Sequence, residues 1–242
     1  MRTALVFILL CALGGDAWAE ESALDAAEQR ATRPFEKQLR QQPDSAAAHL
    51  AYAEFLSDHG QMRTAISHWR LAQLLDPANA AIANSLGGAY LRMGRAVQSA
   101  DQFQRAVDGA SAVAAYHYNL ANVEFLLRRD LTAGWQIDTA ALLHRALSEF
   151  REASRLSPND AEYARGYADA FFVLPNPDWI EAEAAWKHVL KLSPQGDFAC
   201  LQLARVSLKR GDKAGARKFL DQIQDARHEG LKQKLRAQAD KL

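Results

Sequence analysis

The chain has 242 residues with 29 basic and 29 acidic side chains, so its formal net charge is zero. This balance argues against a nucleic-acid binder, which would need a strong basic field. Hydrophobic residues make up 49% of the sequence and charged residues 24%, which is ordinary globular usage and excludes wholesale disorder. We therefore expect a folded protein that does not bind nucleic acid.

Residues 1–19 have the pattern of a secretory signal peptide. A positive start at Arg2 precedes an apolar run over residues 4–13 that is too short to span a bilayer, and residues 17–19 form an Ala-x-Ala site. We predict cleavage after Ala19 and export of the mature chain to the periplasm or beyond the cell. The alternative is an uncleaved membrane anchor. No later run approaches membrane-spanning length, so we expect no membrane span in the mature chain.

Large side chains then recur along the sequence at a nearly constant spacing. They are Phe35, Trp69, Phe103, Phe150, Trp186 and Leu220. The residue numbers give spacings of 34, 34, 47, 36 and 34. A row of small residues four positions earlier keeps the same spacing, namely Ala31, Ala65, Ser99, Ala146, Ala182 and Ala216. This shared spacing predicts a tandem repeat.

Each repeat has the residue pattern of two helices joined by a tight turn. In the second unit Leu86, Gly87 and Tyr90 share one helical face, and the missing side chain of the glycine lets another helix approach closely. Gly94 falls where the two helices must turn, and Pro77 cannot continue the helix that precedes it. The sequence therefore predicts a stack of helical hairpins.

The run from Leu86 to Tyr90, followed by Phe103 and Ala106, resembles the tetratricopeptide repeat (TPR) signature, a helix-turn-helix of 34 residues. The resemblance implies an all-α fold, a right-handed α-α superhelix (TPR solenoid) of about five repeats with capping helices at both ends. The expected parts are a signal peptide at 1–19, an N-terminal helix or half repeat at 20–43, repeats at approximately 44–77, 78–111, 112–158, 159–194 and 195–227, and a capping helix at 228–242.

Two features of this pattern leave particular expectations. Glu124 stands where the second and fourth units have the aromatic residues Tyr90 and Phe171. Shifting the alignment of this helix by one residue would place Phe125 there instead, so the sequence leaves both registers open. The capping helix is expected to shield the last repeat with one apolar stripe at helical spacing. The stripe consists of Leu231, Leu235, Ala239 and Leu242.

The sequence carries no recognisable catalytic or cofactor motif. A His-Glu-x-x-His run, a glycine-rich phosphate loop and a Gly-x-Ser-x-Gly elbow are all missing, so we predict a protein that is not an enzyme and holds no cofactor. His49 and His117 occupy equivalent positions in two repeats, which suggests a metal site, but we favour two packed, half-buried rings. Cys200, the single thiol expected after cleavage, is predicted to be a small buried hydrophobe.

The resemblance also implies that the first helix of each repeat lines a concave groove. The inward positions are Glu54, Asn84, Tyr118, Asn122, Arg165, Asp169 and Arg205. Amides, a phenol and charges of both signs suit hydrogen bonding to a peptide backbone or a carboxylate. The alternative is that these side chains are simply solvated.

Two insertions break the period, one near residues 129–141 and one at 175–180. Asp138 and Asp178 have the character of helix starts. Turns within repeats share one edge of a solenoid, so we expect the insertions to lie side by side. Their apolar residues would form an edge patch for a partner: Trp135, Ile137, Trp179 and Ile180. The alternative is that each tryptophan packs locally in a small core of its own.

These observations favour a non-catalytic scaffold that binds a partner protein or peptide in its groove. The alternative is an accessory subunit of a machine for envelope assembly, export, polysaccharide or pilus formation. Either protein would act as a monomer or as part of a hetero-complex, and the sequence does not name the partner.

Overall fold

The computed structural model describes residues 29–193 and 196–242, and all regular elements within these ranges are helical. The predicted signal peptide and its cleavage site lie outside the described residues. The described chain falls into two compact units with a boundary after Ala78, and each unit is considered by itself. None of the described helices has both the length and the apolar character needed to cross a bilayer.

The first unit contains a helix over residues 29–41, α2 (Ala46–Asp58) and α3 (Met62–Leu75). The Ser45 side chain accepts a hydrogen bond from the amide of Ala48 at 3.2 Å and so caps α2. Phe35 stacks on Tyr52 with ring centroids 5.5 Å apart, which joins the first helix to α2. Helices α2 and α3 pack against each other as one hairpin.

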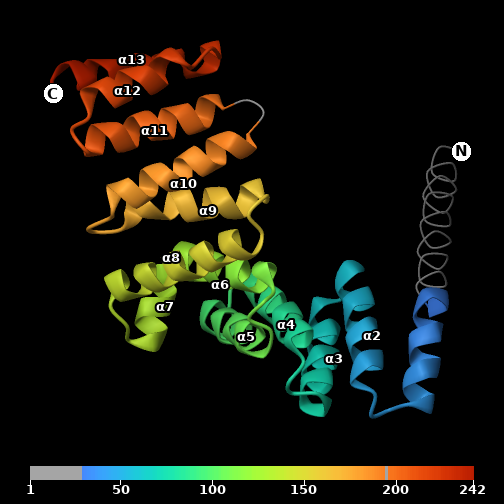
Figure 1. The fold of residues 1–242 in the computed structure, drawn as a ribbon. Helices are drawn as coiled ribbons and strands as arrows, with labels where there is room; N and C mark the ends of the chain where they lie inside the picture. The colour runs from blue at the N-terminus through green and yellow to red at the C-terminus, as the bar shows by residue number, and fades with distance from the viewer. Residues whose placement is uncertain (1–28, 194–195) are drawn as a thin grey trace, which may run out of the picture. The chain divides into compact units, whose positions relative to one another are not determined.

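The second unit contains the remaining helices, which Figure 1 shows in chain order. They are α4 (Ala80–Arg92), α5 (Ala96–Gly109), α6 (Ala114–Leu126), α7 (Arg128–Trp135), α8 (Thr139–Leu156), α9 (Ala161–Ala170), the 3₁₀ turn η1 (Phe171–Val173), α10 (Trp179–Leu192), α11 (Asp197–Lys209), α12 (Lys213–Asp221), η2 (Ala226–His228) and α13 (Glu229–Asp240). The hairpins α4–α5, α6–α8, α9–α10 and α11–α12 pack each on the next. The predicted all-α helix-turn-helix solenoid fold is confirmed.

Two glycines show how the repeat sequence dictates this packing. A Cβ at Gly87 would lie 2.6 Å from the Phe103 ring, so only glycine lets α4 and α5 approach this closely. Gly94 has a φ of 69°, which closes the turn between the same two helices in a conformation that other residues adopt only at a cost. Both predictions made for these residues are confirmed.

The insertion in the third repeat folds into a helix of its own. Residues 128–135 form α7, which packs on α5 and α8 and had not been predicted as a helix. Asp138 follows it and caps α8 by accepting hydrogen bonds from the amides of Ala140 and Ala141, at 2.8 and 3.1 Å. Asp178 caps α10 in the same way, so both predicted helix starts are confirmed.

Glu124 settles the register that the sequence left open. It is fully buried on α6, as Tyr90 is buried on α4 and Phe171 on the 3₁₀ turn that follows α9, whereas Phe125 is only partly buried. The third unit therefore keeps the predicted alignment and places a carboxylate where its neighbours have an aromatic ring.

The prediction that one apolar stripe of the capping helix shields the last repeat is correct for two of its four residues. Leu235 and Ala239 of α13 are buried, but Leu231 stays 45% exposed and Leu242 stays 58% exposed. At 100° per residue Leu231, Leu235 and Ala239 spread over about 80° of the α13 surface, with Leu231 at one margin and Ala239 at the other. The buried Ala239 marks the side that packs on α12 and α11, so Leu231 at the far margin is left uncovered, and Leu242 follows the end of the helix.

Candidate functional site

The polar side chains predicted on the first helices of the repeats form a connected surface in the second unit. We call it the first-helix face and define it by Asn84 of α4, Tyr118 and Asn122 of α6, Arg165 and Asp169 of α9, and Arg205 of α11. Glu54, the remaining predicted member, lies exposed on α2 in the first unit.

Tyr118 connects α6 to α9. Its hydroxyl donates a hydrogen bond to Glu162 Oε1 at 2.9 Å, and its ring lies 4.7 Å from the Tyr163 ring. Burial raises the pKa of Tyr118 to about 12; the hydrogen bond with Asn122 opposes this shift, and Glu162 adds to it. The phenol is therefore neutral at physiological pH and serves as a fixed hydrogen-bonding group.

Two arginines lie against aromatic rings on the same face. The Arg165 guanidinium carbon is 4.7 Å from the centroid of Phe198, and that of Arg205 is 4.1 Å from the centroid of Phe172. Arg165 also forms an ion pair with Asp169 at 3.3 Å. Burial raises the pKa of Asp169, while the charges of Arg165 and Arg205 oppose that shift.

Two neighbouring amides, Asn119 and Gln202, bond to members of this face. Asn119 Nδ2 donates to Asn84 Oδ1 at 2.8 Å, which links α4 to α6. Gln202 Oε1 accepts a hydrogen bond from Arg205 Nη1 at 2.6 Å. An arginine stacked on a ring keeps its remaining N–H donors at the edge of the guanidinium plane, which is where a carboxylate or a peptide carbonyl binds.

The sequence analysis missed three residues that hold this arrangement. Phe172 and Phe198 support the arginines, and Glu162 accepts from Tyr118. Glu162 and Phe198 are themselves 36 positions apart, which equals the local repeat spacing. Glu162 lies one turn before Arg165 and Phe198 lies two turns before Arg205, so following the repeat pattern towards the start of each first helix would have identified both.

Trp135 and Ile137, the first pair predicted for the edge patch, lie between α5 and α8. Both pack on a hydrophobic cluster that includes Leu131 and Leu142. The Trp135 indole donates to Asp101 Oδ1 at 3.2 Å, and the Arg145 guanidinium carbon lies 4.9 Å from its ring. These residues line a surface hollow, and Arg105 lies beside them.

Trp179 and Ile180, the second pair, belong to a different part of the unit. The Trp179 ring lies 5.8 Å from Phe172 and packs on the cluster that contains the cores of the last two repeats. Ile180 is 70% exposed. The two tryptophans thus pack on separate hydrophobic clusters.

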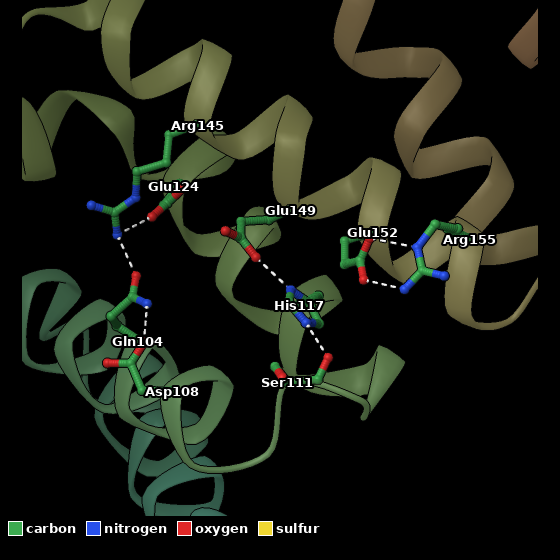
Figure 2. A network of polar contacts seen from close by, with 9 residues as sticks. All are labelled: Gln104, Asp108, Ser111, His117, Glu124, Arg145, Glu149, Glu152 and Arg155. Carbon is green, nitrogen blue, oxygen red and sulfur yellow. Dashed lines mark hydrogen bonds and ion pairs between the residues drawn. The ribbon is translucent and has the colours of Figure 1, made fainter.

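An ion pair with a buried carboxylate joins α6 and α8 of the third repeat, and the same arginine also reaches α5 of the second repeat. Arg145 Nη2 of α8 lies 2.5 Å from Oε1 of the fully buried Glu124, as Figure 2 shows. The same guanidinium donates to Gln104 of α5 at 2.9 Å, and Gln104 donates to Asp108 at 2.8 Å. Burial raises the pKa of Glu124 to about 7; Arg145 opposes this shift and the charge of Glu149 adds to it.

His49 and His117 act as packed rings tied to the backbone. The Nε2 atom of His117 donates to the carbonyl of Ser111 at 2.9 Å, and that of His49 donates to the carbonyl of Pro43 at 3.0 Å. In both repeats the acceptor is six positions earlier, at the repeat boundary. The second nitrogen of His117 lies 2.6 Å from Glu149 Oε2 (Figure 2).

The other candidates for metal or thiol chemistry are also held by local contacts. His68 Nδ1 lies 2.9 Å from His49 Nδ1, and burial lowers the pKa of His68, with the His49 charge adding to the effect. Burial raises the pKa of the Cys200 thiol, which suits a small hydrophobe more than a nucleophile. Across residues 29–193 and 196–242, no group of three or more His, Cys, Asp or Glu side chains could hold a metal ion.

A scan against protein-family models found no match, and a search of curated protein sequences found none either. Solved structures do match. YrrB, described as a TPR protein with an unusual peptide-binding site, aligns with a TM-score of 0.67 at 20% identity over 86% of this chain and 98% of that chain. PilF of Pseudomonas aeruginosa aligns with a TM-score of 0.57 at 20% identity over 81% and 83% of the two chains. PilW, described as a widely conserved type IV pilus biogenesis factor, gives 0.54 at 17% identity over 80% and 83%. These likenesses confirm the predicted repeat fold.

Proposed function

We propose that this chain, a helical repeat protein with the tetratricopeptide fold, is a non-catalytic scaffold that binds a partner protein or peptide on its first-helix face. One observation carries the proposal. Arg165 and Arg205 are held against Phe198 and Phe172, so their free N–H groups are preorganised for a carboxylate or a backbone carbonyl. Together with Asn122, they offer donors on adjacent helices, as an extended peptide requires.

The test removes donors from this face and from a matched surface elsewhere. The partner is first captured from envelope extracts with the tagged mature chain and identified by mass spectrometry. Asn122→Ala combined with Arg165→Ala is expected to weaken binding of that partner at least about tenfold, because two hydrogen-bonding sites are lost. Gln98→Ala combined with Lys191→Ala, an exposed amide and cation on α5 and α10, is the control and should leave affinity unchanged. Equal affinity of both double variants would reject the first-helix face.

The second candidate is an accessory subunit of an envelope machine, for example one that assembles pili. It is favoured by the likeness in fold to PilW, which is itself described as a pilus biogenesis factor. The same capture experiment distinguishes the two roles. A single stoichiometric membrane complex supports the accessory subunit, whereas several dissimilar client proteins support the general scaffold.

The residues predicted for the edge patch extend the proposal to two further contact surfaces, one for each pair, because the pairs lie on separate hydrophobic clusters. Trp135 and Ile137 line a hollow, and Ile180 beside Trp179 is largely exposed. If these side chains bind a partner, Trp135→Ala and Trp179→Ala reduce affinity while the melting temperature barely moves. A loss of roughly 3 kcal/mol of folding free energy in each variant would instead assign both rings to local cores.

Export follows from the sequence of residues 1–19 alone. We expect the mature chain to begin at Glu20 and to reside in the periplasm or outside the cell. Mass spectrometry of the protein from fractionated cells tests this, and an intact N-terminus in the cytoplasmic fraction would contradict it.

A further inference from the structure

An apolar groove lies between α11 and α13 and shares Arg205 with the first-helix face. It has a volume of about 600 Å³, and its apolar lining consists of Leu208 of α11 with Leu231, Leu235 and Leu242. Leu235 is buried in the groove floor, whereas Leu231 and Leu242 remain largely exposed after α13 has packed. The cap therefore ends the solenoid with an uncovered apolar strip.

The leucines of the strip line one side of the groove. Leu231 and Leu235 are four positions apart on α13, which places them one turn apart on the same face, and Leu242 follows the end of the helix at Asp240 and lines the same groove. Within the second unit each hairpin packs on the next, through contacts of α5 with α6, α8 with α9 and α10 with α11. The exposed leucines of the groove offer a further helix a comparable apolar surface.

The charges around the groove have one sign. The charged residues that line it are Arg205 and Lys209, both on α11, and Gln238 is the polar residue opposite them on α13. Lys209 is exposed and makes no hydrogen bond or ion pair within the described part of the chain. The two acidic residues of α13, Glu229 and Asp240, have partners of their own. Gln233 donates to Glu229 Oε1 at 3.0 Å, and the Asp240 carboxylate pairs with Arg217. A partner with acidic side chains beside its apolar face would complement this rim.

We propose that the groove between α11 and α13 binds an amphipathic helix of a partner protein, with leucine-like side chains on one face and flanking carboxylates directed to Lys209 and Arg205. This goes beyond the proposed function, because it uses α13 and a helical partner instead of the extended peptide expected on the first-helix face. Apolar contacts with Leu208, Leu231 and Leu242 supply affinity, and the basic rim sets the orientation and selects acidic helices.

The probe is a capped, fluorescein-labelled 16-residue peptide with leucine at helical positions 1, 5, 8 and 12 and otherwise glutamate and alanine; its twin has lysine for every glutamate. Binding to the full mature chain is measured by fluorescence anisotropy at low and physiological salt. The glutamate peptide is expected to bind saturably, and the lysine peptide at least about tenfold more weakly. Equal binding of the two peptides, or no binding of either, overturns the proposal.

Substitutions in the groove test whether the peptide binds there. Lys209→Glu is expected to weaken the glutamate peptide about tenfold and to strengthen the lysine peptide, whereas Lys218→Glu on the exposed surface of α12 changes neither. Leu231→Ser combined with Leu242→Ser should abolish binding with little change in melting temperature, because both side chains are already exposed.

Two further measurements separate this proposal from its competitors. The Asn122→Ala and Arg165→Ala double variant should keep full affinity for the glutamate peptide, so failure of the first-helix face and failure of this groove are distinguishable. Sedimentation of the unliganded chain tests a second copy as the occupant. A dimer that dissociates on Leu231→Ser with Leu242→Ser would overturn the proposal in favour of self-association.

Discussion

Glu124 is expected to make the stability of this protein depend on pH in an unusual direction. The carboxylate is fully buried, and its pKa rises from an ordinary 4.5 to about 7 in the folded protein. The folded state therefore binds the proton more tightly than the unfolded chain does. The resulting stability is fully present below pH 4.5 and is lost as pH rises to about 7. One pKa unit corresponds to about 1.4 kcal/mol, so the loss amounts to about 3 kcal/mol.

Glu124→Gln isolates this contribution, because the amide keeps the shape of the protonated acid but does not titrate. Urea unfolding of the wild-type protein and of the variant is measured at intervals from pH 4 to pH 8.5. Other titrating groups are common to both proteins and cancel in the difference between their free energies of unfolding. Relative to the wild type, the variant is expected to gain about 3 kcal/mol between pH 4.5 and pH 8.

Glu124→Leu is the control, since leucine also fails to titrate but cannot replace the polar contact of the acid with Arg145. Its absolute stability will differ from that of Glu124→Gln, but its difference curve against the wild type should have the same shape. The reasoning would be refuted if the free energies of unfolding of the wild type and of both variants changed in parallel with pH. It would also be refuted if the variants gained stability relative to the wild type as the pH falls.

Two further predictions concern the close helix contact at Gly87 and the burial of leucines in the cap. Gly87→Ala is expected to lower the free energy of unfolding by about 1–3 kcal/mol because its Cβ would meet a ring at 2.6 Å, whereas Gly88→Ala, in open space on the same helix, should raise it by about 0.5–1 kcal/mol. Thermal unfolding of both variants checks this, and a stabilising Gly87→Ala would contradict it. In the cap, Leu235→Ala should cost about 2–4 kcal/mol and Leu231→Ala almost nothing, because only the first side chain is buried. Equal losses would mean that the whole apolar stripe packs.

The repeat spacing was enough to predict the helical architecture, because every hairpin must bury the same kinds of residues at the same positions. Gly87 beside Phe103 is a local rule that a sequence shows directly. The helix α7 was missed because the eight residues from Arg128 to Trp135 carry only one fully buried side chain, Leu131. So short an apolar signal does not distinguish a helix from a loop.

The sequence predicted which positions of the first helices carry polar groups, but it did not predict what holds them. The stacking of Arg205 on Phe172 depends on η1, where the chain leaves the α-helix before the second insertion. The partial burial of the cap stripe was unpredictable for a related reason. Leu231 and Leu235 are equally apolar, and the tertiary packing of α13 on α11 and α12 decides that Leu235 is the one covered.

Arg145 gives the last prediction, because it is the cation that makes a buried Glu124 tolerable. Its guanidinium contacts Glu124 at 2.5 Å, Gln104 at 2.9 Å and the face of Trp135 at 4.9 Å. Arg145→Met keeps an unbranched side chain for packing but leaves a buried carboxylate without a counter-charge, which costs about 3–5 kcal/mol at pH 8. At pH 5 the loss should be smaller, because Glu124 takes up a proton instead.

The same substitution in a Glu124→Gln background separates charge from packing. There Arg145→Met should cost little and show no pH dependence, since no buried charge remains to be compensated. If the loss is the same in both backgrounds, Arg145 stabilises the third repeat through its contacts with Gln104 and Trp135. In that case the surrounding core, and not the ion pair with Arg145, would make the burial of Glu124 tolerable.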